Sequence, residues 1–580
     1  MPSRRPVAPA KQWASRGRVL RLLSLVALLV LLAVLGSLSL LSTVHDDTTA
    51  AGTGSASGGE LRLSNALGSN MVLQRGVAAA IWGQSLADDT VECTLLLHNG
   101  NTEVATSQRS AQQTGQHWVV TLRPQPAGGP HQLVCTSTLL PGATVTLKQV
   151  FFGDVFLCAG QSNMVFPVNR SFTAAQELQD AAAVPRPGLR IFAAAPDKSL
   201  TAAPVPHAHG FRSLSTPWSP AASPGVVSGF SAVCWTAGKT IYDALGGEVP
   251  IGLIAAAAGG SCIEKWSPDV ALRACGQPVG QGSLYSAMIA PLVPHTRLAG
   301  VLWYQGESNV GPAASGTCGV QGLHYECAFS QLLTAWRLAF NKPDLPWAHV
   351  QLSPFTPFSD ANGSSLALLR HAQLAATQRA VETPTALVTA IDQGDADSPY
   401  GDIHPRGKAA IGARLAGALL HLVYGNTTAW PPWRSPVCVA AQLVDAGPGA
   451  TAAGLLRVVF HSDEGDGLNR LVLRPPAGCH PQSGAPGGDA RLRCAGWELQ
   501  SDGDGSWHAA QGVRVENGSA VVMGAPPGLR GVAGVRYAWS AWPALSLFST
   551  SGLPALPCAL DVVRDTLESR HDMLVPLDIV

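Results

Sequence analysis

The stretch Val155-Phe156-Leu157-Cys158-Ala159-Gly160-Gln161-Ser162-Asn163-Met164 decides the fold class of this chain. Its first five residues are apolar, as in a strand that is buried on both faces of a sheet. The glycine permits a tight turn, and Ser162 follows where the strand ends. Similar apolar runs recur downstream at residues 189–193, 251–258, 298–304, 347–352 and 386–391.

Longer segments with helical apolar spacing separate several of these runs, at residues 230–245, 330–340, 366–381 and 408–423. Buried strands that alternate with helices predict an α/β fold, in which a parallel sheet carries helices on both faces. In such sheets ligands bind beyond the carboxyl ends of the strands. The residues just after each strand are therefore the ones to search for chemistry.

Flanking segments have a different pattern, with short apolar runs between Gly- and Pro-rich turns. Runs at residues 91–97, 117–122 and 131–135 predict an antiparallel β domain over 60–150. Runs at 454–460 and 520–523 predict a C-terminal β region over 430–560, with an exposed loop at 478–489 and a tail at 561–580. The central domain then covers 151–429. The two β regions are either independent or one unit that the central domain splits.

The N-terminus predicts targeting to a membrane. A basic segment, 1–21, precedes 23 consecutive uncharged residues at 22–44, and a flexible linker follows at 45–59. A signal peptide has a shorter apolar core of about 7–15 residues, whereas about 20 span a bilayer. An uncleaved signal anchor is the first interpretation, a cleaved signal peptide the second and a buried soluble helix the third. Both leading interpretations place the rest of the chain in the secretory lumen or outside the cell, as a type II membrane protein or a secreted one.

Composition agrees with that compartment. The 38 basic and 38 acidic residues cancel, which argues against a nucleic-acid partner. None of the 12 cysteines forms a Cys-x-x-Cys pair, so disulfides are expected and a zinc ribbon is not. Sequons occur at Asn169, Asn362, Asn426 and Asn517.

Four polar blocks follow four of the predicted strands. Ser162 could act as a nucleophile, and backbone N–H groups beyond it could face an oxyanion. The other blocks are Gly259-Gly260-Ser261-Cys262-Ile263-Glu264-Lys265-Trp266, Gln305-Gly306-Glu307-Ser308-Asn309 and Gly401-Asp402-Ile403-His404-Pro405. A histidine beside carboxylates after the last strand suits a general base with an orienting acid. Taken singly, each block could equally be an ordinary turn.

The blocks GQSNM, GGSCIEKW, WYQGESN and DIHPRGK resemble the sialate O-acetylesterase family of carbohydrate esterases. The resemblance extends to MVLQR at 71–75, IWG at 81–83 and LPALP at 553–557, so it spans roughly residues 60–558. It implies an SGNH-hydrolase-like fold and a serine esterase that removes O-acetyl groups from sialic acid. No metal or other cofactor is implied.

The resemblance assigns Ser162 as the nucleophile and His404 as its base. Gly260 and Asn309, with the Ser162 N–H, would form the oxyanion hole, and Gln305 is a rival to Asn309. Ser308 receives no role. SGNH hydrolases place the acid three residues before the histidine, which here is Gly401. Asp402 is the expected substitute, with Asp392, Asp395 or a backbone carbonyl as alternatives.

Several functional alternatives stay open at this stage. The acetylated carbohydrate could be xylan, pectin or another glycan, because no motif reads the sugar. Trp266, Trp303 and Tyr304 could stack on a sugar ring, although core packing is the commoner role of such residues. A catalytically silent glycan-binding protein would lack Ser162 or His404. A membrane-tethered adhesion protein or scaffold would leave the four blocks unexplained.

Overall fold

The computed structural model describes residues 60–106, 116–196, 210–311, 318–357, 364–380, 382–425, 429–444, 455–461, 470–474 and 496–563. The predicted segments 1–21, 22–44 and 45–59, the loop at 478–489 and almost all of the tail lie outside these residues. Contacts group Gly59–Val580 into one compact unit. In the described part, no helix has both the length and the apolar character needed to cross a bilayer.

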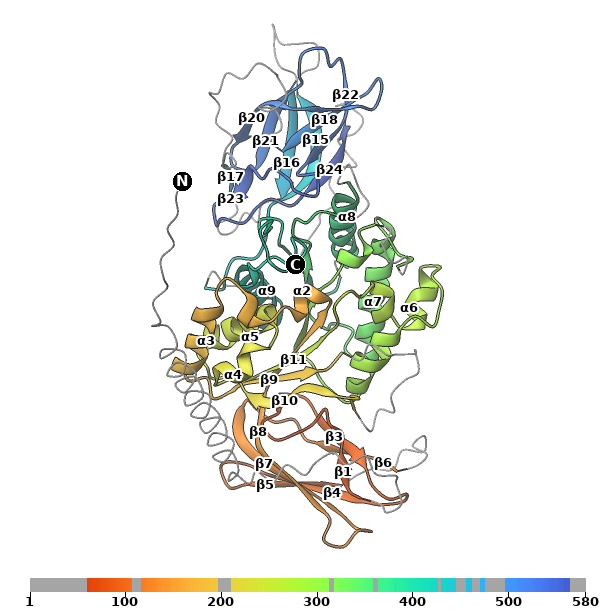
Figure 1. The fold of residues 1–580 in the computed structure, drawn as a ribbon, viewed down its shortest axis with the longest axis vertical. Helices are drawn as coiled ribbons and strands as arrows, with labels where there is room; N and C mark the ends of the chain where they lie inside the picture. Colours follow the sequence, from red (N-terminus) through yellow and green to blue (C-terminus); the bar gives the residue numbers. More distant parts are fainter. Residues whose placement is uncertain are drawn as a thin grey trace, which may run out of the picture. The chain divides into compact units, whose positions relative to one another are not determined.

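The central sheet confirms the strands predicted for the middle of the chain (Figure 1). Its strand order is β10-β9-β11-β8-β12-β13-β14, and Figure 1 labels β8, β9, β10 and β11 of it. The strands are β8 (Thr144–Gly160), β9 (Leu189–Ala194), β10 (Leu214–Pro220), β11 (Ile251–Ala257), β12 (Gly300–Tyr304), β13 (Trp347–Gln351) and β14 (Thr385–Thr389). All neighbours pair in parallel except β10, which runs antiparallel to β9 at the edge. Strand β10 was not predicted, because its two prolines weaken the strand pattern and are tolerated at an edge.

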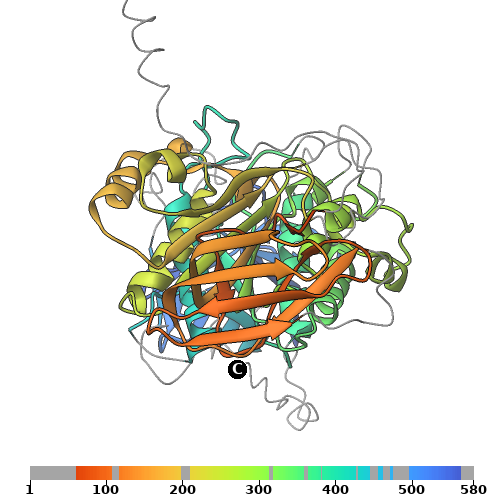
Figure 2. The same cartoon turned by 90° about the horizontal axis from the view of Figure 1, so that it is seen from below.

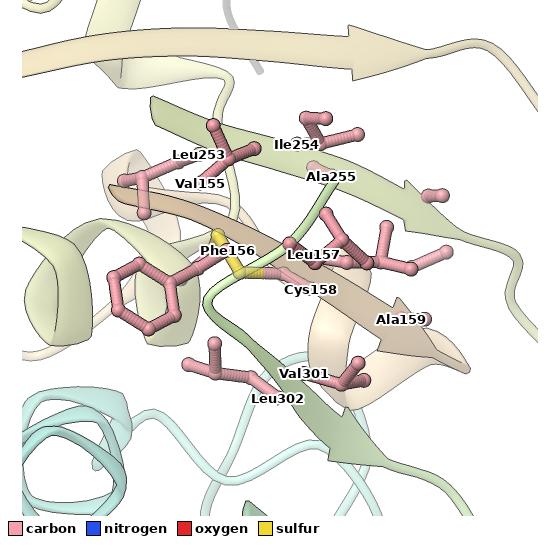
Figure 3. Packing of buried hydrophobic residues seen from close by; sticks show 14 of the residues in the cluster. Val155, Phe156, Leu157, Cys158, Ala159, Leu253, Ile254, Ala255, Val301 and Leu302 are labelled. Carbon is pink, nitrogen blue, oxygen red and sulfur yellow. A yellow bond between two sulfur atoms is a disulfide. The ribbon is translucent and has the colours of Figure 1, made fainter. Parts of the chain in front are cut away.

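Complete burial explains the unbroken apolar runs of this sheet. Every residue of β11, β12 and β13 is buried. Figure 3 shows Val155, Leu157 and Ala159 of β8 packed beside residues of β11 and β12. Because helices cover both faces, alternate side chains of each strand enter apolar surroundings rather than water.

Helices cover the sheet on both faces. Helices α5 (Ala232–Ala244) and α9 (Lys408–Tyr424) pack against each other, and α7 (His324–Ala339) packs with α8 (Ser364–Arg379) on the other side (Figure 1). All four were predicted, although α7 begins six residues before the predicted start at residue 330. The shorter helices are α2 (Ser162–Val165), η1 (Val168–Arg170), α3 (Ala174–Ala183), α4 (Pro224–Ser228), η2 (Ile263–Trp266), α6 (Asp269–Ala274), η3 (Tyr285–Ile289), η4 (Ala290–Leu292) and η5 (Glu307–Asn309).

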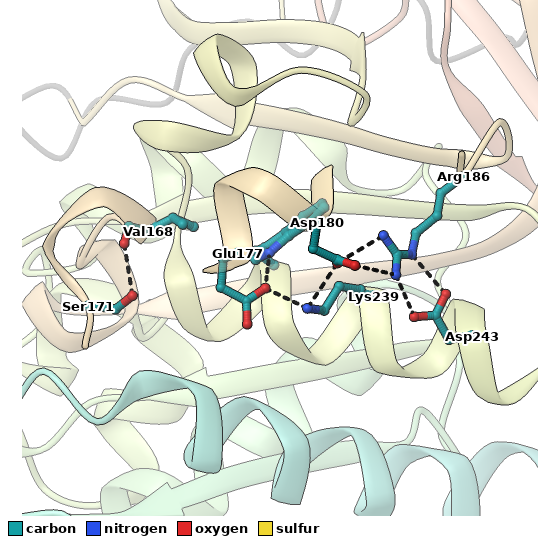
Figure 4. A network of polar contacts seen from close by, with 8 residues as sticks. Val168, Ser171, Glu177, Asp180, Arg186, Lys239 and Asp243 are labelled. Carbon is teal, nitrogen blue, oxygen red and sulfur yellow. Dashed lines mark hydrogen bonds and ion pairs between the residues drawn. The ribbon is translucent and has the colours of Figure 1, made fainter. Parts of the chain in front are cut away.

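A charged network joins α3 to α5 (Figure 4). The Lys239 Nζ lies 2.5 Å from Glu177 Oε2 and 3.2 Å from Asp180 Oδ2. The Arg186 guanidinium bonds Asp243 through two nitrogens at 2.8 Å each, and it also contacts Asp180. Bidentate pairs of this kind fix geometry as well as charge. The network therefore holds the segment after Ser162 against a helix of the sheet's face.

The N-terminal β region is continuous with the central sheet. Strands β1 (Arg62–Leu63), β3 (Ala79–Gln84) and β6 (His117–Leu122) form a three-stranded sheet. Strands β2 (Val72–Gln74), β4 (Val91–Leu96), β5 (Thr102–Thr106) and β7 (Gly128–Ser137) connect to the central sheet through β8. Figure 2 shows several of these strands side by side, in orange. The predicted boundary at 150/151 therefore falls inside one 17-residue strand.

The C-terminal β region forms a sheet of its own. Its eight strands are β15 (Val437–Val444), β16 (Leu455–His461), β18 (Trp497–Ser501), β19 (Trp507–Ala509), β20 (Gln511–Glu516), β21 (Ala520–Gly524), β22 (Val532–Tyr537) and β24 (Cys558–Val563). Strands β17 (Leu471–Leu473) and β23 (Leu547–Ser549) form a further pair. No described strand of the N-terminal region pairs with these, and their core is separate. The alternative of one β unit split by the central domain is therefore wrong.

Five disulfides confirm the prediction that the cysteines pair, and they indicate a secretory or extracellular environment. Cys158–Cys234 links β8 to α5, and it is the yellow bond in Figure 3. The other pairs are Cys93–Cys135, Cys262–Cys318, Cys275–Cys327 and Cys438–Cys558. Cys479 and Cys494 lie outside the described residues, as do the sequons at Asn362 and Asn426. The sequon asparagines Asn169 and Asn517 are both exposed.

Candidate active site

Ser162 lies at the carboxyl end of β8, where the strand turns into α2. The turn depends on Gly160, whose φ is 137° and whose added Cβ would come within 2.1 Å of the Tyr304 carbonyl oxygen. The next residue, Gln161, donates its backbone N–H to that same carbonyl at 2.9 Å. Ser162 is the first residue of α2, so its N–H has no partner within the helix. The side chain is partly exposed.

The second block forms a turn beside the nucleophile. A Cβ added to Gly259 would lie 3.6 Å from the Cβ of Ser162. Gly260 has φ of 67°, and both glycines are exposed. The Ser261 hydroxyl donates to the Ala258 carbonyl at 2.7 Å, and this bond across the turn fixes its conformation. This arrangement suits backbone donation toward a group bound at Ser162.

Asn309, a predicted oxyanion donor, is fully buried and uses both of its amide hydrogens. Its Nδ2 donates to Glu264 Oε2 at 3.0 Å and to the Val320 carbonyl at 2.7 Å. Its Oδ1 accepts from the backbone N–H of Ile263 at 3.0 Å. An oxyanion role for Asn309 would require one of these bonds to break. In this structure the side chain positions the second block.

Gln305, the rival donor, is equally committed. Its Nε2 donates to the Ser261 carbonyl at 3.0 Å and to Asn309 Oδ1 at 2.8 Å. Because a carbonyl only accepts, the Ser261 contact identifies the amide nitrogen, and Oε1 accepts from the Tyr325 hydroxyl at 2.8 Å. The fully buried Gln305 therefore ties the second block to the third.

His404 is oriented by a backbone carbonyl. Its Nδ1 lies 2.8 Å from the carbonyl oxygen of Tyr400, four residues before it in the chain. A carbonyl only accepts hydrogen bonds, so Nδ1 must carry the proton in the neutral ring. The Nε2 atom is then unprotonated, which is the form that a general base needs.

Asp402, the predicted orienting acid, shares no hydrogen bond with His404 in the described part of the chain. Its Oδ2 instead accepts the backbone N–H of Thr356 at 2.8 Å, on the loop after β13. The Nδ1 of His404 is occupied by the Tyr400 carbonyl. Asp402 therefore braces the histidine loop against a neighbouring loop, and the backbone-carbonyl alternative has the observed contact.

The two substitute carboxylates are also engaged elsewhere. Asp392 accepts from two nitrogens of Arg414 at 2.7 and 2.6 Å. Asp395 accepts from the Arg406 guanidinium at 2.7 and 2.9 Å, and this hydrogen bonding keeps the pKa of Asp395 below its usual value. Both pairs hold the loop that carries His404.

Sequence reasoning missed a buried polar cluster beneath the nucleophile, formed by Asn163, Glu307 and Lys408. The Asn163 Nδ2 donates to Glu307 Oε1 at 2.5 Å and to the Ile403 carbonyl at 2.9 Å. Its Oδ1 accepts from Lys408 Nζ at 2.6 Å. All three residues lay within the quoted blocks, and nothing in those largely polar blocks distinguished them from their neighbours.

Burial dominates the electrostatics of this cluster. Lys408 is completely buried, and desolvation lowers its pKa to about 7. Its Nζ lies 4.9 Å from the centre of the Phe166 ring. Burial also raises the pKa of Glu307, whose Oε2 has no hydrogen-bond partner within the described residues.

Ser162 and His404 both follow carboxyl ends of strands of the central sheet. In the described part no hydrogen bond joins the serine hydroxyl to the imidazole. The residues next to them are joined instead, because Asn163 bonds the carbonyl of Ile403. This hydrogen bond joins the first block directly to the fourth block.

The aromatic residues near the blocks do not face a substrate. Trp266, Trp303 and Tyr304 are each fully buried, and Trp266 packs edge-to-face on Trp303 with ring centres 5.8 Å apart. The stacking alternative is therefore wrong for all three, and core packing is their role. Among the described residues, no group of three or more His, Cys, Asp or Glu side chains is placed to hold a metal ion.

Comparison with known proteins gives the relationship of the chain. Residues 152–421 match the family model described as carbohydrate esterase, sialic acid-specific acetylesterase. The chain is 33% identical to human sialate O-acetylesterase over 394 residues, which cover 63% of this chain and 71% of that protein. This chain belongs to the sialate O-acetylesterase family. Its members are carboxylic ester hydrolases, and the resemblance inferred from the motifs is confirmed.

Two further relatives extend the comparison. The mouse sialate O-acetylesterase is 31% identical over 421 residues, covering 63% of this chain and 74% of its own. The crystal structure of a carbohydrate acetylesterase from Xanthomonas citri is similar at a TM-score of 0.68 with 26% identity. It covers 86% of this chain and 99% of its own, so the likeness includes both β regions as well as the catalytic sheet.

Proposed function

We propose that this protein is a serine esterase that hydrolyses O-acetyl esters on sialic acids, with Ser162 as nucleophile and His404 as general base. The observation that carries the proposal is the contact between His404 Nδ1 and the Tyr400 carbonyl, since it leaves Nε2 free to take a proton. Ser162 stands at the carboxyl end of β8, as expected for an SGNH-hydrolase-like site. Family membership supports the substrate class.

The reaction proceeds through an acetyl-enzyme. His404 Nε2 takes the Ser162 proton while the serine oxygen attacks the acetyl carbonyl carbon. The tetrahedral intermediate collapses as His404 returns the proton to the departing sugar oxygen. Water then attacks the acetyl-serine with His404 again as base, and acetate leaves as Ser162 regains its proton.

Backbone groups are the proposed oxyanion donors. The N–H of Ser162 begins a helix, and the turn at Gly259 and Gly260 lies against the serine. Oxyanion donors act best when they are fixed before the reaction. Asn309 and Gln305 fix this turn by their hydrogen bonds to Ile263 and Ser261. We therefore assign these two amides a positioning role.

The Tyr400 carbonyl takes the role that Asp402 was expected to fill. It holds the imidazole in the catalytic tautomer, and its partial negative charge stabilises the imidazolium that forms. The neighbouring Ser398 hydroxyl donates to the carbonyl of His404 at 2.7 Å, so both ends of this turn are fixed. The site therefore works as a Ser–His dyad.

We propose the membrane topology and the N-glycosylation sites from the sequence pattern. Residues 22–44 would anchor the protein as a single-pass type II membrane protein, or would be cleaved to release it. In both cases the esterase faces the lumen or the exterior. The exposed Asn169 and Asn517 are proposed N-glycosylation sites, together with Asn362 and Asn426.

Acetate release from a panel of substrates tests the function. The panel contains 9-O-acetyl and 4-O-acetyl sialic acids, acetyl-xylan and acetylated pectin, with Ser162→Ala as the control enzyme. Highest kcat/KM on a sialic acid is expected, and loss of the serine should reduce kcat by about 10⁶-fold. A higher kcat/KM on acetyl-xylan or acetylated pectin would show that the substrate is another glycan. No release from any ester would favour the silent binding protein.

The nucleophile is identified separately by labelling. A serine-directed fluorophosphonate should modify Ser162, and mass spectrometry of the digested protein locates the adduct. Modification of Ser308 instead would overturn the assignment.

A further inference from the structure

A hollow of about 410 Å³ lies where the central sheet meets the C-terminal β region. Pro354 and Gly394, from the loops after β13 and β14, line one side of it. Trp542, Phe548 and Arg474 of the C-terminal region line the other. It therefore opens at the carboxyl edge of the sheet, the edge that also carries Ser162. None of its residues has a role in the acyl transfer described above.

Trp542 is a large apolar residue with 40% of its surface exposed. Its position is fixed by Arg370, a completely buried residue of α8. This guanidinium donates to the Ser540 carbonyl at 2.8 Å, to the Ala541 carbonyl at 3.2 Å and to the Leu352 carbonyl at 2.9 Å. A buried arginine thus ties the segment before Trp542 to the end of β13. An exposed tryptophan held by rigid backbone is suited to stack on a sugar ring.

One basic residue, Arg474, and one acidic residue line the hollow. Asp392 is the acidic residue that lines it, and both oxygens of Asp392 already accept from Arg414. Arg474 is exposed, and within the described residues its guanidinium forms no ion pair or hydrogen bond. It lies 5.2 Å from the centre of the Phe548 ring. A carboxylate is the group that a free guanidinium of this kind binds most strongly.

The hollow adjoins the catalytic loop. A Cβ added to Gly394 would come within 2.6 Å of the Trp542 ring, so the two are in close contact. Gly394 begins the loop that leads to His404, and Asp402 of that loop bonds Thr356, two residues after Pro354. Strand β14 is three positions from β8 in the sheet. At a strand spacing of about 4.8 Å, the carboxyl ends of β8 and β14 are roughly 14 Å apart, so a sugar in the hollow would be a different unit of the glycan from the one that carries the acetyl ester.

We propose that this hollow is a subsite for a carboxylate-bearing sugar of the substrate glycan, which stacks on Trp542 and pairs its carboxylate with Arg474. The inference rests on the proposed function and deepens it, because it states how the enzyme recognises an acidic sugar. The acyl-transfer site reads only the acetyl ester. The subsite supplies a selection for acetylated glycans that carry an acidic sugar over neutral acetylated glycans.

Kinetics of the full-length protein test the subsite, with three substrates and four variants. The substrates are an O-acetylated sialyl oligosaccharide, acetyl-xylan and 4-nitrophenyl acetate. The variants are Trp542→Ala, Arg474→Ala, Arg474→Lys and, as a matched control, Arg514→Ala, an exposed arginine of β20 outside the hollow.

Arg474→Ala should raise KM for the sialyl substrate about ten- to hundredfold and leave acetyl-xylan unchanged, since it removes one charge-assisted contact. Arg474→Lys should recover part of this loss. Trp542→Ala should weaken both sugar substrates. Arg474→Ala and Trp542→Ala should leave kcat/KM for 4-nitrophenyl acetate unchanged, because that ester has no sugar. Arg514→Ala should behave as wild type on all three substrates.

Unchanged KM for the sialyl substrate in both Trp542→Ala and Arg474→Ala would overturn the proposal. An equal loss on all three substrates would also overturn it, because it would show a structural role. If wild type cleaves 4-nitrophenyl acetate but no sugar ester, the proposed function fails. Calorimetric titration with free sialic acid then decides the subsite alone: binding lost in Arg474→Ala supports it, and no binding by wild type rejects it.

Discussion

The side-chain nitrogen of Asn163 donates a 2.9 Å hydrogen bond to the backbone carbonyl of Ile403. These two residues stand next to the proposed nucleophile and the proposed base, 240 positions apart in the chain. One amide therefore sets the separation between the nucleophile turn and the histidine turn. Glu307 and Lys408 hold that amide in place from the third block and from α9.

Replacing Asn163 with alanine should lower kcat while the protein stays folded. Without the bond to Ile403, the histidine turn can shift, and a displacement of about 1 Å at reacting atoms costs up to about 100-fold. Ser162 should still react with a fluorophosphonate, but more slowly. Steady-state kinetics and labelling rates measure both effects. Wild-type kcat in this variant would show that other contacts set the geometry.

Asp402→Asn should reduce kcat less than tenfold, because the Tyr400 carbonyl orients the imidazole. The asparagine keeps an oxygen that can accept the Thr356 N–H. A true orienting acid would cost about 10⁴-fold when converted to its amide. A loss of that size would restore Asp402 to the site and replace the dyad with a triad.

The buried amine of Lys408 should make stability depend on pH. Native Lys408 loses its proton near pH 7, whereas the unfolded side chain keeps it up to its ordinary pKa of 10.5. Between these values the unfolded chain binds more protons, so this group makes the native state more stable as pH rises. Urea unfolding at pH 7 and pH 9 should show the rise in wild type and a smaller rise in Lys408→Met.

Glu307 changes the free energy of unfolding with pH in the opposite direction, and it does so at lower pH than Lys408. Its native pKa lies above the ordinary 4.5, so its share of stability falls as pH increases through the native pKa. The informative quantity is therefore how much more the free energy of unfolding rises with pH in wild type than in Lys408→Met. An identical pH dependence in the two proteins would contradict the assignment of a depressed lysine pKa.

The Cys158–Cys234 bridge should stabilise the strand that carries the nucleophile. It closes a segment of 76 residues between β8 and α5. Removing a bridge of this kind costs about 2–5 kcal/mol in small secreted domains. The double variant Cys158→Ala/Cys234→Ala should lose about this much in urea unfolding without reductant. An unchanged midpoint would show that packing alone holds the two elements.

A protein that begins at Gly59 should fold and keep its activity. The contacts of Gly59–Val580 form a compact unit of their own, which contains every residue assigned to the site. Solubility, thermal unfolding and kcat/KM on an O-acetylated sialic acid measure the outcome. An insoluble or inactive product would assign the N-terminal segment to the folded core.

The sequence determined the sheet and the edge at which the candidate site residues lie. Apolar runs reveal buried strands because a strand covered on both faces excludes polar side chains. Turn residues after those runs mark the carboxyl edge, where parallel strands gather their loops. The four blocks made Ser162 and His404 the candidate nucleophile and base, and their likeness to one family predicted the enzyme class.

Only the tertiary structure decided what the polar side chains of those blocks do. Sequence position favoured Asp402 as the partner of His404, and the family resemblance implied Asn309 as an oxyanion donor. Neither spacing nor residue type shows which hydrogen-bond partner a side chain has already taken. In the folded chain Asp402 accepts from Thr356, and Asn309 gives both hydrogens to Glu264 and Val320.

For the same reason, sequence patterns could not predict the cluster of Asn163, Glu307 and Lys408 or the hollow beside Trp542. Asn163 meets Lys408 across 245 positions, and Arg370 meets the Trp542 segment across 170. Such contacts depend on how strands order themselves in a sheet, which local patterns do not encode. Residue type sets what each group can donate or accept, and the packed fold decides which partner it meets.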